Sequence, residues 1–345
     1  MTHLIQQRPI VVTLALLLCA TAQADVVRLV SGRSQTGEVT RVTRDAVTLE
    51  RRGKPTVVPV EQIRAVLFED EPSTLGQARL NVASGGYETA LDALRPLAAS
   101  AGDGLVGQEI KFYTAFCQAR LAIAGQSDAK TAGRLLSSFV KNHGDSFHYY
   151  EAVESIGDLY VSLGAHDRAI RMYALTAKSP RLPIKLRAAL LAGKASQAAG
   201  DNAKAIQRFD AVINAKGDSP LLTPLRRDAR LAKATALAAS GQLDGALTIL
   251  GEVLERADEN DVAINAAAYN ALGRCYDAAD RPTDALFAYL HTDLLFDSDQ
   301  ASHAEALARL ADLWEEAGKP DAARDAADRL RRQYAATRAA REAGG

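Results

Sequence analysis

One phrase recurs seven times along this chain: a small turn residue, a short linker and then an alanine. The intervals between successive turn residues are 40, 39, 36, 41, 39 and 38 residues. A fixed period of this size predicts stacked helical hairpins, in which each hairpin contacts only its neighbours. Such a chain offers a binding surface more readily than a reaction centre. The seven turn residues are Gly85, Gly125, Gly164, Gly200, Gly241, Asp280 and Gly318.

Individual copies of the repeat share a pattern of aromatic and small residues. The clearest copy reads Tyr269-Asn-Ala-Leu-Gly-Arg-Cys-Tyr276 and continues with Ala285 and Tyr289. It resembles the tetratricopeptide repeat, whose usual period is about 34 residues, so the longer period here implies longer helices or loops. The resemblance implies an α-solenoid, a superhelix of about seven helical hairpins over residues 74–330. Residues 331–345 are then expected to form a capping helix and tail.

Two sets of residues are expected to shape the hairpins. Small residues in the first helices should let the two helices of a hairpin approach closely: Gly157, Gly193 and Gly273. Large rings in the second helices should fill the space between successive hairpins: Tyr173, Phe209 and Tyr289.

Cys117 and Cys275 fall in first helices four repeats apart. In an oxidising compartment two cysteines can pair. Stacked repeats contact only their neighbours, however, and a disulfide needs Cα atoms within about 7 Å. The sequence therefore predicts two buried core cysteines.

Residues 1–24 resemble a secretory signal peptide. Arg8 supplies positive charge, Ile10 to Leu18 form an apolar segment, and Ala22-Gln-Ala24 is a small-residue cleavage site before Asp25. The apolar segment is too short to span a bilayer comfortably. We therefore expect a periplasmic or secreted protein cleaved near Ala24, with a retained membrane anchor as the less favoured alternative.

Residues 25–71 change to an alternating pattern rich in β-branched residues. Five short strands in this segment predict a small closed barrel, because closure removes sheet edges. Gly37 stands where a strongly bent strand needs a residue without Cβ. The segment resembles the small SH3-like or Sm-like barrels near the N-termini of exported bacterial proteins. The candidate strands are Val26–Val30, Gly37–Thr43, Ala46–Arg51, Thr56–Val60 and Ala65–Glu69.

The charge balance argues against a nucleic-acid partner. The chain carries 41 Lys+Arg and 42 Asp+Glu, a net charge of −1. Some Sm-like relatives bind RNA, but here acids nearly balance the basic residues of 25–71, and no aromatic stacking platform precedes Phe68. We expect the barrel to supply a second attachment point or a self-association surface.

The resemblance to tetratricopeptide arrays implies a peptide-binding groove lined by first helices. Aligning the copies on Leu272-Gly273 assigns the inward positions. The predicted groove is striped with acidic, basic and mixed segments. A basic or amphipathic partner segment could bind the acidic residues of this groove. The simpler explanation is that most of these charges only solvate exposed helix faces. The polar residues assigned to the groove are Glu151, Glu154, Asp158, Arg187, Lys194, Gln197, Asp228, Thr235, Asn270, Arg274, Asp277, Glu305, Asp312, Glu315 and Glu316.

The sequence contains no catalytic or cofactor motif: no G-x-S-x-G elbow, phosphate-binding loop, H-E-x-x-H or C-x-x-C. His143 and His148 are close, with Asp145 between them, but their spacing fits no standard metal site. The repeats run almost to residue 330, which leaves no room for an appended catalytic domain. We expect no cofactor, no metal and no enzymatic activity.

The sequence therefore predicts an exported scaffold or adaptor that binds a protein or peptide partner along the groove in a cell-envelope complex. One alternative is an accessory subunit that positions a catalytic partner of an envelope enzyme or secretion machine. Another is a hydrolase with its site in the groove. A buried Glu or His facing a closed pocket would favour the hydrolase, and a shallow groove without perturbed titratable groups would count against it.

Overall fold

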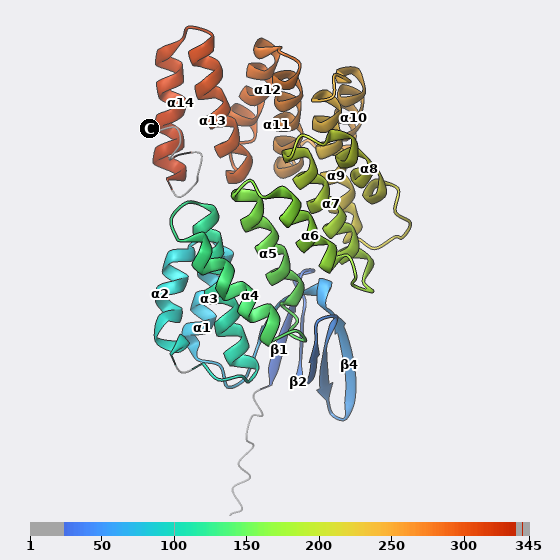
Figure 1. Ribbon diagram of the computed structural model, residues 1–345, viewed down its shortest axis with the longest axis vertical. Helices are drawn as coiled ribbons and strands as arrows, with labels where there is room; N and C mark the ends of the chain where they lie inside the picture. The colour runs from blue at the N-terminus through green and yellow to red at the C-terminus, as the bar shows by residue number, and fades with distance from the viewer. Residues whose placement is uncertain (1–23, 100, 336–339, 341–345) are drawn as a thin grey trace, which may run out of the picture.

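The computed structural model describes residues 24–99, 101–335 and 340 of the chain. Within these residues, five β-strands precede fourteen α-helices, which pair into seven consecutive hairpins. Figure 1 shows the hairpins stacked in chain order, with the strands at one end of the molecule. The helical repeat architecture is therefore confirmed. The expected signal peptide lies outside the described residues, apart from Ala24.

The strands form one antiparallel sheet in the order β4-β3-β2-β1-β5. All five predicted strands are present, with boundaries shifted by at most three residues. The strands are β1 Asp25–Leu29, β2 Ser34–Thr43, β3 Ala46–Arg51, β4 Lys54–Pro59 and β5 Ile63–Leu67, with the 3-10 turn η1 Val60–Gln62 before β5.

Each hairpin pairs a first helix with a second helix. The first helices are α1 Ser73–Ala83, α3 Leu105–Ile123, α5 Tyr149–Ser162, α7 Leu182–Ala198, α9 Leu222–Ala238, α11 Val262–Ala278 and α13 Gln300–Glu316. The second helices are α2 Tyr87–Ala98, α4 Ala129–Asn142, α6 His166–Thr176, α8 Asn202–Ile213, α10 Leu243–Arg256, α12 Pro282–Leu295 and α14 Pro320–Tyr334. Residues 331–334, where the expected capping helix starts, continue α14. Residues 336–339 and 341–345 lie outside the described part of the chain.

The expectation of a closed barrel is wrong, because β4 and β5 remain the two edges of the sheet. The sheet does bend at Gly37: β2 pairs with β1 up to Gly37 and with β3 from Glu38 onward. A Cβ at Gly37 would lie 2.6 Å from the carbonyl oxygen of Glu50. Phe147, just before α5, packs into the core of the sheet. The helical array thus covers the apolar side of the sheet, which closure would otherwise have to bury.

All seven predicted turn residues have positive φ, which confirms the seven hairpins. The six glycines have φ between 67° and 82°, and Asp280 has φ 55°. This left-handed conformation ends a helix at little cost for glycine and is strained for most other residues. The requirement explains why glycine recurs at this point of the period.

A glycine facing a ring lets the two helices of a hairpin approach closely. A Cβ added at Gly157, Gly193 or Gly273 would lie 2.4, 2.5 or 2.6 Å from a ring atom of the second helix. Each ring is buried and also joins a cluster with the first helix of the next hairpin, as predicted. The three rings are Tyr173, Phe209 and Tyr289.

A buried polar network connects α1, α3 and α5. Arg79 donates to Glu109 at 2.8 Å, and Nε2 of His148 lies 2.8 Å from the other oxygen of Glu109. Burial alone would lower the pKa of His148. The charge of Glu109 and the hydrogen bonds with Glu109 and Glu151 outweigh burial and raise the pKa of His148 to about 9. His148 is therefore a cation at neutral pH that compensates the buried carboxylate of Glu109.

Polar contacts attach the sheet to the third and fourth hairpins. Asp45, between β2 and β3, accepts hydrogen bonds from the hydroxyls of Tyr150 at 2.8 Å and Ser179 at 3.3 Å. Arg181, just before α7, donates to the carboxylate of Glu61 in η1 at 2.5 to 3.1 Å. Two hairpins are thus fixed against one sheet.

Both cysteines of the array are buried free thiols, Cys117 in α3 and Cys275 in α11. Burial raises the pKa of each thiol to about 12. The prediction of two buried core cysteines is confirmed.

Replacing Gly273 by alanine tests the contact between glycine and ring. We expect Gly273→Ala to lower the free energy of unfolding by about 1 to 3 kcal/mol, because the new Cβ must displace the ring of Tyr289. The matched control is Gly251→Ala in α10, where an added Cβ meets nothing within 4 Å. That change should raise the free energy of unfolding by about 0.5 to 1 kcal/mol. Equal effects in urea denaturation would contradict the packing argument.

The raised pKa of His148 makes stability depend on pH. Since the pKa of His148 in the folded protein is about 9 and its ordinary value is 6.5, the contribution to stability is fully present below pH 6.5 and is lost as pH rises through 9. We expect the free energy of unfolding to fall by on the order of 1 to 3 kcal/mol across this window. His148→Gln should remove this part of the dependence of the free energy of unfolding on pH. Denaturant titrations at several pH values measure it, and an unchanged slope in the variant would count against the network.

Candidate functional site

Two cavities follow one another along the face of the array formed by the first helices. The first has a volume of about 880 Å³ and is lined from α2, α3, α5, α6 and α7. The second has a volume of about 620 Å³ and is lined from α7, α9, α11 and α13. Lys194 lines both cavities, which therefore form one path. This path, named the inner groove, includes Tyr87, Arg120, Asp158, Lys194, Gln197, Thr235, Asn270, Arg274 and Glu305.

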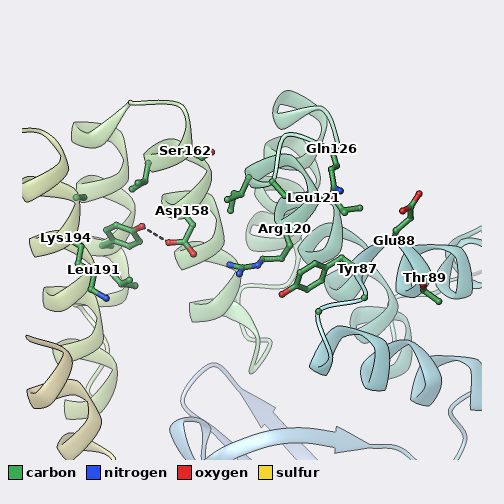
Figure 2. Close-up of a pocket in the computed structure, with 17 residues that line it drawn as sticks. Tyr87, Glu88, Thr89, Arg120, Leu121, Gln126, Asp158, Ser162, Leu191 and Lys194 are labelled. Atoms are coloured by element: carbon green, nitrogen blue, oxygen red, sulfur yellow. Dashed lines mark hydrogen bonds between the residues drawn. The ribbon is translucent and has the colours of Figure 1, made fainter. Parts of the chain in front are cut away.

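The first cavity lies where the turn of the first hairpin faces α3, α5 and α7 (Figure 2). In this view Arg120 lies between Tyr87 and Asp158, and its guanidinium carbon is 5.6 Å from the centre of the Tyr87 ring. The hydroxyl of Tyr173 donates to Asp158 at 2.7 Å, which holds that carboxylate in place. The cavity offers fixed polar groups beside apolar side chains such as Leu191.

The second cavity brings together several residues that the repeat register assigned to the groove. They come from α7, α11 and α13, and α9 contributes Asp228 and Thr235 between them. Asn270 is buried and donates from Nδ2 to the carbonyl oxygen of Ser302 at 2.8 Å. The predicted residues in this cavity are Lys194, Gln197, Asp228, Thr235, Asn270, Arg274 and Glu305.

Contacts between neighbouring first helices engage several polar side chains of the second cavity. Gln197 donates from Nε2 to the hydroxyl of Thr235 at 2.8 Å, and Arg274 forms an ion pair with Glu305. Lys194 is exposed and has no ion-pair partner in the described part of the chain. An uncompensated cation therefore lies where the two cavities meet.

Glu151, Glu154 and Arg187 line a third cavity, of about 470 Å³, at the junction with the sheet. Glu154 is 6% exposed, and its Oε2 accepts a hydrogen bond from Nε of Arg187 at 2.7 Å. Burial raises the pKa of Glu154 to about 7, although the charge of Arg187 opposes this rise.

The remaining predicted groove residues line none of these three cavities. Arg309 on α13 donates to Asp277 at 3.0 Å and to Asp312 at 2.8 Å. Glu315 and Glu316 are exposed at the end of α13. The predicted acidic stripe near the C-terminus is therefore partly neutralised within the protein.

Two parts of the inner surface were missed by the sequence analysis. Tyr87 and Arg120 come from the first two repeats, which lack the Leu-Gly register used for the later copies. Val60 in η1 and Ile63 in β5 line the third cavity. A turn glycine at Gly85 marks the first repeat, but no sequence pattern indicates that a sheet docks on the array.

The side chains around His143 do not converge on one point. His148 turns inward to Glu109, and Asp145 lies 3.6 Å from Arg44. Burial lowers the pKa of His143. Across residues 24–99, 101–335 and 340, no group of three His, Cys, Asp or Glu is placed to hold a metal ion. In the same residues, no helix combines the length and apolar character needed to cross a bilayer.

Glu154 partly meets the criterion set for a hydrolase, since it is buried, faces a cavity and has a raised pKa. Arg187, however, already occupies one of its carboxylate oxygens. Among the described residues, no serine, cysteine or lysine lines the third cavity, and the hydroxyl of Tyr150, which does line it, donates to Asp45. The arrangement offers an acceptor for a hydrogen-bond donor.

No protein-family model and no curated protein matches the chain. A tetratricopeptide repeat protein from Parabacteroides merdae superimposes with a TM-score of 0.53 at 14% identity, over 79% of this chain and 98% of that chain. A Rap protein complexed with competence and sporulation factor gives 0.49 at 16% identity over 76% of each chain. NprR in complex with its cognate peptide NprX gives 0.43 at 12% identity over 79% of this chain and 80% of that one. At these identities the comparisons show similarity of fold alone. The superposition on the first of these structures shows that the array of this chain is a tetratricopeptide-like solenoid.

Proposed function

We propose that this protein is an exported, non-enzymatic scaffold that binds a protein or peptide segment along the inner groove within a cell-envelope complex. The observation that carries the proposal is the path of two cavities that share Lys194 and cross the first helices of consecutive hairpins. A path of this kind suits a peptide, because recognition grooves take successive side chains in successive pockets.

The chemistry of the groove supports a polypeptide ligand. Gln197 and Thr235 supply amide and hydroxyl groups, and Leu231 supplies apolar surface beside them. Binding sites commonly combine apolar walls with a few convergent polar groups that orient the ligand. Lys194 carries three N–H donors and an uncompensated charge, so it would take an acidic side chain of the segment.

The exported setting is supported by the sequence of residues 1–24, with its basic start, apolar segment and Ala22-Gln-Ala24. The sheet would give the scaffold a second attachment surface. Its edge strand β4 presents Val57, which is 62% exposed. An edge strand offers unpaired backbone groups to another chain.

Site-specific photocrosslinking tests the groove. We expect a photoreactive side chain in place of Gln197 to give one dominant adduct in native envelope extract, because Gln197 lines the second cavity. The matched control is the same replacement at Gln207, which is exposed on α8 of the same hairpin and should give no such adduct. Equal yields from both positions would contradict binding in the groove. If the crosslinked partner is an enzyme, the result would favour the alternative in which this protein is an accessory subunit that positions a catalytic partner.

The same assay separates local charge from total charge. Combined with the probe at Gln197, Lys194→Glu should lower the adduct yield about tenfold, because it reverses the uncompensated charge beside the acidic group. Lys185→Glu changes total charge equally at an exposed position of α7 that lines none of the three cavities. A similar loss in both variants would show that the groove charge has no specific role.

Export is tested by determining the N-terminus of the chain isolated from the cell envelope. We expect it to begin at Asp25, because Ala22 and Ala24 provide the small residues that signal peptidase requires. Replacing both alanines by aspartate should leave the longer chain unprocessed. A chain that keeps residue 1 in the wild-type protein would contradict cleavage at this site.

A further inference from the structure

One helix of the array, α12, carries an apolar face that is left open to solvent. The buried side of α12 packs into its hairpin through residues such as Ala285 and Tyr289. On the exposed side, Phe287 is 58% exposed, Leu294 is 71% exposed and Leu295 is 63% exposed. Residues seven and eight apart are separated by about two turns of an α-helix, so these three side chains lie on one side of it. We name them the outer face of α12.

The other hairpins show that this composition is unusual for the repeat. The position two residues after the recurrent alanine is exposed in all seven second helices, and the position nine residues after it is exposed as well. In α12 these positions are Phe287 and Leu294. Large exposed apolar groups gathered on one surface mark an interaction site. The first position holds Asp92, Arg134, Arg171, Gln207, Thr248 and Asp325 in the other helices, and the second holds Ala99, Lys141, Lys178, Asn214, Glu255 and Arg332.

The remaining segments of the chain do not supply a cover for this face. Residues 336–345 contain no apolar side chain larger than alanine. Residues 1–24 do contain an apolar segment, but the proposed cleavage after Ala24 removes it. A second copy of the chain does offer a matching apolar surface, because the outer face of α12 can pack against its own equivalent.

The charges beside the outer face favour a second copy as the occupant. In Figure 1, α12 lies between α10 and α14. The position nine residues after the recurrent alanine is Glu255 in α10, Leu294 in α12 and Arg332 in α14. Both charged side chains are exposed, and neither has an ion-pair partner among the residues that the structure describes. At this level of the stack the surface is therefore acidic, apolar and basic in turn.

This order of charges also selects the direction of the contact. A two-fold axis parallel to α12 would place α10 of each copy opposite α14 of the other. Such an axis preserves the level along the helices, so Glu255 of one copy would face Arg332 of the other on both sides of the apolar contact. An axis perpendicular to α12 would instead bring α10 against α10 and separate the two charges. Complementary charges therefore favour the parallel arrangement.

We propose that a second copy of this chain covers the outer face of α12, in a parallel two-fold dimer with ion pairs between Glu255 and Arg332. Three apolar side chains from each copy make a small contact, since a stable interface usually buries about 800 Å² on each partner. The dimer is therefore expected to depend on concentration, with a dissociation constant on the order of 10 µM.

The dimer would leave the inner groove of each copy open. Among the described residues, none from α12 lines either of the two cavities that form the groove. Two grooves held in one assembly would bind a partner with two copies of its segment more tightly than one groove does. The dimer is independent of the proposed groove function, because each single copy carries a complete groove.

Sedimentation velocity of the purified protein from about 1 to 100 µM tests the dimer, and the mass should rise toward twice that of the monomer. Phe287→Gln and Leu294→Asn introduce the residues that α8 carries at the same repeat positions. Each should weaken dimerisation at least about tenfold, because a two-fold interface contains every residue twice. The matched control is Leu80→Asn on α1, a leucine that is 58% exposed, and it should leave the dissociation constant unchanged. Circular dichroism checks that each variant is folded.

A charge exchange tests the direction of the contact. Glu255→Arg should weaken dimerisation about fivefold, because it places two arginines against each other at both ends of the interface. Adding Arg332→Glu to that variant restores opposite charges across the interface. The double variant should return to within about twofold of the wild-type dissociation constant.

A monomer throughout the concentration range would overturn the proposal. Equal losses in Leu80→Asn and Phe287→Gln would also overturn it, because the outer face of α12 would then have no special role. A double variant that dimerises no better than Glu255→Arg would overturn the parallel arrangement.

Discussion

The close approach of two helices within a hairpin sets the geometry on which the inner groove depends. Gly273 brings the backbone of α11 against the ring of Tyr289, whose hydroxyl then donates to Asp277 at 3.1 Å. Tyr173 orients Asp158 in the same way in the third hairpin. A buried ring therefore fixes both the packing of its hairpin and the direction of a carboxylate on the first helix. The same buried rings therefore determine the packing of the core and the position of polar groups on the groove surface.

Buried charges join the separate parts of the molecule where apolar contact alone would allow several arrangements. Arg79, Glu109 and His148 tie the first three hairpins together through ion pairs with defined geometry. Glu61 and Arg181 tie the sheet to the fourth hairpin. Because a buried charge without its partner is strongly destabilising, these pairs select one relative placement of the elements they connect.

Much of the array could be predicted because its requirements are local. A left-handed helix end favours glycine wherever it occurs, so positions such as Gly164 are recognisable without knowing their neighbours. The repeat register likewise placed Lys194 and Arg274 on one surface. The cavity beside the sheet could not be predicted, since it depends on Glu61 meeting Arg181, 120 residues away. The sheet was wrongly expected to close into a barrel for the same reason. The helices that cover its apolar side lie outside residues 25–71.

The attachment of the sheet has a mechanical consequence for the solenoid. Its polar contacts reach Tyr150, Ser179 and Arg181, so they brace α5 and α7 against a common body. The later hairpins, from α9 to α14, are joined within the described residues chiefly to their own neighbours along the stack. One end of the array is therefore braced by the sheet, and the other end lacks that brace. Bending of the unbraced hairpins would change the width of the second cavity, because α9, α11 and α13 line it.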